Sequence, residues 1–135
     1  MNAFAHIGQQ CDAIEECYEF MLAYAAQGIG DDRQSRHGSQ LRELLARAVD
    51  AAAGIPEAYA GVLTAVDPAT APKYIRFLEV LKADTSKALA AMELVLVQSR
   101  MPSQLIDNLN ASVHLRTLLA DIFLLDEILR LQQTP

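Results

Sequence analysis

The sequence predicts an all-α protein, built as an up-and-down four-helix bundle. Three observations favour this fold: apolar residues recur with helical spacing, glycine and proline divide the chain into about four long segments, and β-branched residues are sparse. The chain has 135 residues, 52% of them apolar, which suffices for one domain with a complete core over residues 1–135. No internal repeat or long linker divides it.

The first predicted helix runs from Ala3 to Gln27. Its apolar residues are spaced alternately three and four positions apart, which is the a/d pattern of helices that pack in bundles. This seam consists of Phe4, Ile7, Cys11, Ile14, Tyr18, Met21 and Ala25. Gly28 and Gly30 are expected to end the helix, because glycine adopts the left-handed conformation beyond a helix C-terminus at little cost.

Residues 28–38 (GIGDDRQSRHG) are polar and are predicted to form a loop, after which Ser39 is placed to cap a second helix. Leucine, alanine and valine then recur at helical spacing. Pro56 lacks a backbone donor and disfavours helix at the residue before it. The second helix is therefore predicted to be kinked or split near Pro56, with any second piece ending near Val66.

A third helix is expected after a tight connection at residues 67–72. Thr70 can cap it and Pro72 suits its first turn, because the missing proline donor is not needed there. The helix is predicted to end near Arg100, before Pro102. Its middle is rich in alanine, which would let a neighbouring helix approach closely.

The fourth helix is predicted from Ser103 or Asn110 to Gln132. Residues 118–131 are apolar on nearly every side, and a helix without a polar face must be covered on most sides. A homodimer explains this most simply, with contact through this helix or through the seam of the first. The residues expected to carry self-association are Phe123, Leu124 and Ile128.

The charge of the chain is concentrated at its start. The first 32 residues hold six acidic side chains and no lysine or arginine, and the formal net charge of the whole chain is −6. Asp12, Glu16 and Glu19 share one side of the first helix. This face is expected to select a basic protein surface and to repel nucleic acid and anionic membranes; the alternative is a solvated helix face.

The two cysteines indicate a reducing compartment. Cys11 and Cys17 are six residues apart on one helix, which places them too far apart and on different sides for a disulfide. The chain starts without a basic, apolar leader, and no apolar run approaches the ~18 residues of a membrane span. We therefore expect a cytoplasmic protein that does not enter a membrane.

Known catalytic and metal-binding motifs are absent from the sequence. No glutamate is followed three residues later by histidine, as the di-iron bundles of the ferritin type require. His6, His37 and His114 lie on different segments, and no clustered Cys or His ligands for zinc are present. The sequence thus predicts no metal, no cofactor and no catalytic residue.

One segment has the composition of an anion site. Basic side chains precede a predicted helix N-terminus, where free amide groups and the helix dipole attract anions. The residues concerned are Arg33, Arg36, His37 and Ser39. The alternative interpretation is a surface loop with scattered charges.

These patterns favour a non-enzymatic interaction module, such as an adaptor, assembly factor or small chaperone, that acts through its helical faces as a homodimer. The alternative is a ligand- or metal-binding bundle of ferritin-like architecture without the usual motifs. It would need polar groups that point inward, for which the candidates are Tyr18, Tyr24, His114 and Asp121. An enzyme that uses scattered carboxylates also stays open, because acid–base pairs need no sequence motif.

Overall fold

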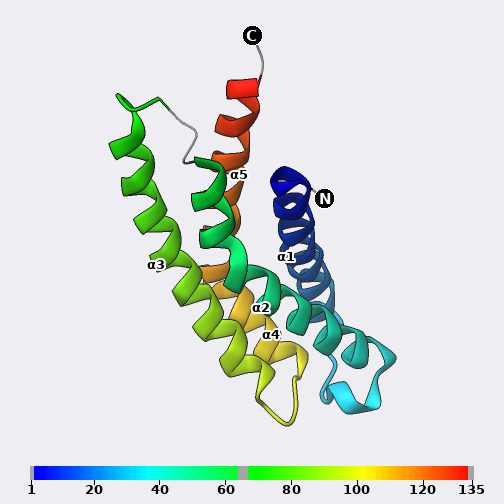
Figure 1. Ribbon diagram of the computed structural model, residues 1–135. Helices are drawn as coiled ribbons and strands as arrows, with labels where there is room; N and C mark the ends of the chain where they lie inside the picture. The colour runs from blue at the N-terminus through cyan, green and yellow to red at the C-terminus, as the bar shows by residue number, and fades with distance from the viewer. Residues whose placement is uncertain (1, 64–66, 134–135) are drawn as a thin grey trace.

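The computed structural model describes residues 2–63 and 67–133, and within these ranges every regular element is helical (Figure 1). The elements are α1 (Ala3–Ala25), the short 3₁₀ helix η1 (Asp32–Gln34), α2 (Arg36–Leu63), α3 (Ala71–Leu96), α4 (Ser103–Ala111) and α5 (His114–Gln133). The predicted all-α class is confirmed. The prediction of four helices is wrong, since the described ranges contain five α-helices.

The extra helix arises because the predicted fourth helix is interrupted at Val113. This residue has a φ of 61°, in the left-handed region, where an α-helix cannot continue. The Ser112 hydroxyl donates to the Leu109 carbonyl oxygen (2.6 Å) and helps to close the last turn of α4. Val113 in turn accepts a hydrogen bond at its carbonyl from the Thr117 amide (2.9 Å), at the start of α5.

α2 is continuous through Pro56, so the alternative of a split helix is wrong. The helix also begins earlier than predicted, at Arg36, because the Ser35 hydroxyl rather than that of Ser39 accepts a hydrogen bond from the His37 amide (3.1 Å). Figure 1 shows that α2 changes direction part-way along its length. The predicted end at Val66 lies outside the described residues.

α3 starts as predicted, with Pro72 in its first turn. Thr70 precedes the helix, but its hydroxyl donates to the Asp67 carbonyl oxygen (3.1 Å) instead of accepting from a helix amide. The helix ends at Leu96, a turn before the predicted end at Arg100.

The core lies where α2 packs against α1 and α3, and where α4 and α5 complete the other side. The seam predicted for α1 is used inside the protomer: Ile7, Cys11, Ile14 and Met21 are all buried. α5 buries its own leucine-rich face against α3 and α1, and Figure 1 shows α3 and α1 on opposite sides of the protein. Within the described ranges, the backbones of α1 and α3 do not pack against each other.

One end of the bundle is held by a buried carboxylate. Asp32 is 2% exposed, and its two oxygens accept from the Arg42 Nε (2.6 Å) and from the Met101 amide (2.6 Å). Burial acts to raise the pKa of Asp32, but the hydrogen bonds from Arg42 and Met101 outweigh it and hold the pKa below its usual value. Asp32 thereby joins η1, α2 and the connection between α3 and α4.

A second set of hydrogen bonds joins the end of α1 to the start of α4. Tyr24 donates its hydroxyl to the Met101 carbonyl oxygen (2.7 Å), and the Ser103 hydroxyl donates to the Tyr24 carbonyl oxygen (2.7 Å). Ile29 and Ser103 also exchange hydrogen bonds, through the Ile29 amide (2.8 Å) and the Ser103 amide (2.7 Å). These contacts satisfy backbone groups that would otherwise be buried unpaired.

The close approach between the backbone of Asp32 and the first turn of α2 requires glycine at position 38. A Cβ atom at this position would lie 2.0 Å from the Asp32 carbonyl oxygen, whereas at Gly8 of α1 nothing lies within 4 Å. We expect Gly38→Ala to lower the free energy of unfolding by about 1–3 kcal/mol, despite the better helix propensity of alanine. The control Gly8→Ala should raise it by roughly 0.5–1 kcal/mol. Urea titration measures both, and equal effects of the two substitutions would contradict the close approach.

Val113 stores strain that glycine would relieve, since a β-branched residue rarely adopts positive φ. We expect Val113→Gly to raise the free energy of unfolding by about 1 kcal/mol, because relief of the backbone strain outweighs the loss of a side chain that is 41% exposed. Val113→Ala serves as the control, since it shortens the side chain but keeps a Cβ. A higher melting temperature for Val113→Ala than for Val113→Gly would show that the backbone at this position is not strained.

Candidate functional site

An apolar groove of about 450 Å³ lies between α1 and α5. We call it the α1–α5 groove. Its lining residues are Glu15, Tyr18, Glu19 and Leu22 from α1, with Arg116, Leu119, Ala120 and Phe123 from α5. Leu22, Leu119 and Phe123 make its middle apolar, and the two glutamates form an acidic rim on the α1 side.

The groove exists because α1 directs its buried seam mainly toward α2 and α4 and contacts α5 over a smaller area. A second hollow of about 330 Å³ shares Tyr18, Leu22 and Arg116 with it and extends the recess to Asp107 of α4. Together the two hollows follow α1 from Glu15 to Ala26, which is roughly 17 Å of helix. That length matches about three turns of a bound helix.

The lining of the groove is net negative, since Glu15 and Glu19 on the α1 side outnumber Arg116 on the α5 side. The pKa of Glu15 is raised by partial burial and by the neighbouring charges of Asp12, Glu19 and Asp126. These charges come from both walls, since Asp126 lies on α5. A cation brought by a ligand would stabilise the charged form of the Glu15 carboxylate, which three other acidic groups repel.

The structure divides the predicted acidic face into two parts. Glu19 lines the α1–α5 groove. The charge of Asp12 raises the pKa of Glu15, which lines the same groove. Glu16 instead points toward α2, where the Arg47 guanidinium lies 3.9 Å from its carboxylate in an exposed ion pair. Sequence spacing alone did not single out Glu15, whose pKa is raised by burial and by its acidic neighbours.

The residues predicted for self-association also lie in different surroundings. Phe123 is 51% exposed and belongs to the α1–α5 groove. Leu124 is exposed beside it on α5, whereas Ile128 is half-buried. These three residues therefore do not form one isolated apolar patch, and their role in self-association stays a prediction.

The predicted anion site is not assembled around a common point. Arg33 is engaged by Asp31 through an ion pair of 2.8 Å, and this contact lowers the pKa of Asp31 to about 2. His37 is hydrogen-bonded through Nδ1 to Gln27 (3.0 Å). Arg36 and Ser39 are exposed in the first turn of α2. An anion site formed by these residues stays a prediction.

Two carboxyl groups meet between α3 and α5. Asp121 is hydrogen-bonded to Asp84, and burial together with this neighbour raises the pKa of Asp121 to about 7. Its Oδ2 atom is buried and has no hydrogen-bond partner. The other inward candidates are placed elsewhere: Tyr24 binds Met101, Tyr18 lines the α1–α5 groove, and His114 begins α5.

A third buried polar group links α1, α2 and α5. Tyr59 donates a short hydrogen bond to Asp126, and the Cys11 Sγ lies 3.6 Å from the Tyr59 hydroxyl oxygen. Burial raises the pKa of Cys11 to about 11 and that of Cys17 to about 12. Both thiols are thus kept protonated, which suits core packing rather than nucleophilic chemistry.

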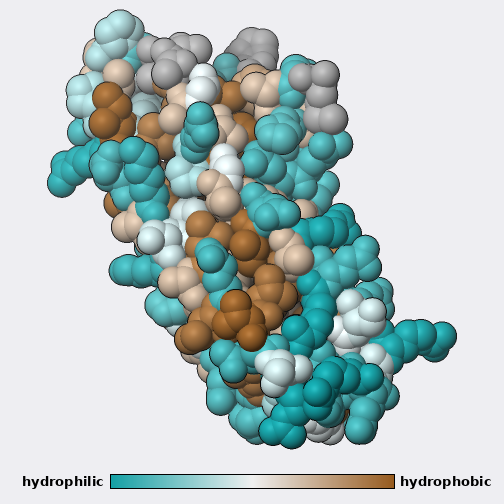
Figure 2. Space-filling view, turned by 60° about the horizontal axis from the view of Figure 1, so that its bottom comes forward, coloured by the Kyte–Doolittle hydropathy of each residue, from teal (hydrophilic) through white to brown (hydrophobic). Residues whose placement is uncertain are grey.

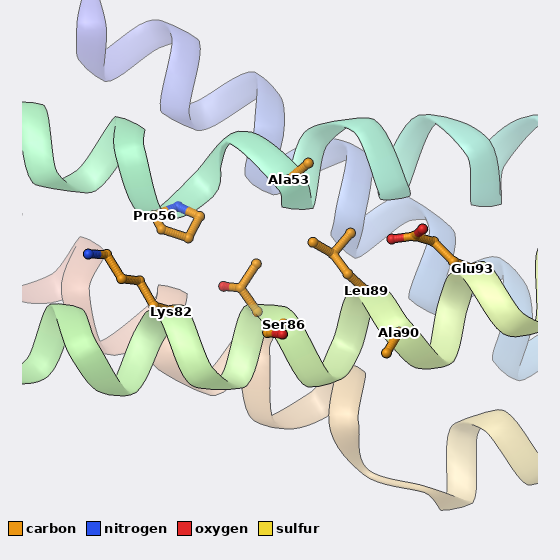
Figure 3. A pocket seen from close by; sticks show the side chains of 8 residues that line it. Ala53, Pro56, Lys82, Ser86, Leu89, Ala90 and Glu93 are labelled. Atoms are coloured by element: carbon orange, nitrogen blue, oxygen red, sulfur yellow. The ribbon is translucent and has the colours of Figure 1, made fainter.

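A second groove, of about 470 Å³, lies between α2 and α3 (Figure 3). We call it the α2–α3 groove. Ala53 and Pro56 line it from α2, and Figure 3 shows Leu89 of α3 pointing into it, with Lys82 at one end and Glu93 at the other. Figure 2 shows apolar side chains gathered near the middle of one face of the protein.

No protein-family model, curated protein or solved structure matches the chain. Among the described residues, no group of three or more His, Cys, Asp or Glu side chains is placed to hold a metal ion. The described helices also include none with the length and apolar character needed to cross a membrane.

The carboxyl pair predicts an unusual pH dependence of stability. Because the folded-state pKa of Asp121 is raised to about 7, its stabilising contribution is complete below the unfolded pKa of about 3.9 and is lost as the pH rises through about 7. We expect Asp121→Asn to exceed the parent in stability at pH 8, by on the order of 1 kcal/mol, and to unfold with little pH dependence between about pH 5 and 8.

Chemical denaturation at several pH values measures this effect. Asp50→Asn, which removes an exposed carboxyl of α2, is the matched control and should keep the pH dependence of the parent. An unchanged pH profile in Asp121→Asn would show that the pair does not share a proton.

Proposed function

We propose that this protein is a non-enzymatic interaction module, an adaptor, assembly factor or small chaperone, that binds an amphipathic helix of another protein in the α1–α5 groove. The observation that carries the proposal is the combination of an apolar floor with an acidic rim. A helix with apolar residues on one face would bury them against Leu22, Leu119 and Phe123. Its flanking lysine or arginine residues would lie beside Glu15 and Glu19.

Charge selects the partner in this proposal. Partial burial and the charges of Asp12, Glu19 and Asp126 raise the pKa of Glu15 in the free protein, and a basic helix would offset the repulsion from those charges. Complementary charge at the rim raises the association rate and disfavours acidic partners. The same charge supports the expectation that nucleic acid and anionic membranes are not bound.

The two protonated core cysteines support a reducing compartment, and we propose the cytoplasm. The second candidate function, a bundle that binds a small ligand or metal, is favoured by a single observation. This is the buried Oδ2 atom of Asp121, which lacks a hydrogen-bond partner.

A designed peptide tests the groove directly. The probe is a fluorescent amphipathic helix of about 18 residues with leucine on one face and lysine on both flanks; its control carries glutamate in place of lysine. We expect the lysine peptide to bind at least about tenfold more tightly than the glutamate peptide, and to weaken as salt increases.

Two variants locate the binding. Leu22→Arg, in the groove, should abolish binding of the lysine peptide, and the double variant Glu15→Gln and Glu19→Gln should remove the preference for lysine. Leu94→Arg, at an exposed leucine of α3, is the control and should bind as the parent does. Equal binding of both peptides, or unchanged binding by Leu22→Arg, would contradict the proposal.

A further inference from the structure

α3 is apolar on two opposite sides. Its core side is formed by Leu81, Thr85, Ala88, Met92 and Val95, which are buried. On the other side, six exposed residues follow the spacing three, four, three, four, three. This outer seam consists of Val80, Ala83, Lys87, Ala90, Leu94 and Val97. Leu94 is 65% exposed and Val97 75%, so the described residues leave most of both side chains uncovered.

We infer that the outer seam of α3 is a homodimer surface, on which α3 of a second copy packs in the antiparallel direction. The alternating spacing is that of the a and d positions of a coiled coil, and five residues of the seam are apolar. Ordinary surface helices carry their apolar residues on one side only. A second seam at coiled-coil spacing therefore indicates a second helix as its partner.

The sizes of the side chains fit a reversed copy. If Val80 packs against Val97 of the second copy, Ala83 comes to lie beside Leu94 of the second copy. The small alanine leaves room for the large leucine, which is how a and d residues of opposite helices fill space together. The two-fold axis repeats each such contact once, so the surface is complementary to itself.

Charge favours the same direction. Lys82 and Glu93 lie on one side of α3, eleven residues apart, and stand at opposite ends of the α2–α3 groove (Figure 3). A reversed copy brings its Glu93 to the side of Lys82, which forms an exposed ion pair with Glu79 in the protomer (3.6 Å), and brings its Lys82 to the side of Glu93. A parallel copy in register would instead turn these two sides away from each other and would place the two Lys87 side chains at the same level of the seam.

Lys87 limits the strength of the association. A single lysine at an a position lowers coiled-coil stability, because its ammonium group must leave the seam to stay hydrated. The interface is also short, since residues 80–97 span roughly 27 Å of helix. We therefore expect a reversible dimer that dissociates on dilution.

The outer seam is separate from the proposed helix-binding site. The backbone of α1, which forms one wall of the α1–α5 groove, does not pack against that of α3 in the described ranges. Dimerisation through α3 would leave both α1–α5 grooves open, so one dimer would present two binding sites. Self-association is thereby assigned to α3 rather than to Phe123, Leu124 and Ile128.

Sedimentation equilibrium over a range of protein concentrations tests the dimer without any partner. We expect Leu94→Glu to raise the dissociation constant of the dimer roughly a hundredfold or more. Because Leu94 is exposed in the protomer, circular dichroism and the melting temperature of the diluted monomer should not change. Lys87→Leu should tighten the dimer about tenfold, whereas Lys82→Leu, outside the seam, should not.

Charge exchange tests the antiparallel register. Lys82→Glu and Glu93→Lys should each weaken the dimer roughly three- to tenfold, and the double variant should restore it, because both pairs are then rebuilt with reversed signs. A parent that is monomeric at millimolar concentration, or a double variant that is not restored, would overturn the inference. Leu22→Arg should keep the parent's dissociation constant, so failure of the dimer and failure of the helix-binding proposal are told apart.

Discussion

The carboxylate of Asp32 is the interaction on which the arrangement of the helices depends. It is buried beside the N-terminal part of α2 and receives hydrogen bonds from Arg42 and from the backbone amide of Met101. Arg42 extends the contact to the end of α3, where its guanidinium donates to the Gln98 carbonyl oxygen (3.0 Å). Arg42 is only partly buried, but its loss would leave the buried Asp32 carboxylate without its cationic partner, which is destabilising. The backbone of Asp32 comes so close to α2 that only glycine fits at position 38.

This anchored end determines where the surfaces of the protein lie. Tyr24 and Ser103 attach the end of α1 to the start of α4, so α1 is drawn toward α4 and α2 and packs less closely against α5. Val113 then redirects the chain, and α5 returns along α3. Because α1 packs mainly on α2 and α4, and α5 mainly on α3, the α1–α5 groove remains between α1 and α5. α3, on the far side, keeps its outer seam free.

The two proposed surfaces would work together. A dimer joined through α3 would hold two acidic, apolar grooves on separate sides, and each groove would accept one basic helix. Binding at two linked sites strengthens attachment to a partner that carries two helices or is itself dimeric. The buried Asp84–Asp121 pair lies between α3 and α5, the helices that carry the two surfaces. The proton of this pair therefore contributes to the packing of α3 against α5.

Local patterns in the sequence determined the class of the fold and some of the helix boundaries. The spacing of Ile7, Cys11 and Ile14 predicted the buried side of α1, and Pro72 marked the start of α3, because both signals act within one or two turns. The acidic character of the first helix was also evident, since composition needs no structure. The sequence left open whether Pro56 kinks or splits its helix, and it did not reveal that Val113 divides the last one, because neighbouring helices decide whether such strain is tolerated.

Only the tertiary structure decided which apolar and charged residues meet. The spacing of Val80, Ala83, Ala90, Leu94 and Val97 can be read from the chain, but it became a candidate surface only when the other side of α3 proved to be the buried one. Likewise Glu15 stood out only once Asp126 of α5 was placed near it, more than a hundred residues later in the chain. The sequence by itself fixes the faces of each helix through local periodicity, whereas burial, pairing and exposure depend on contacts between distant segments.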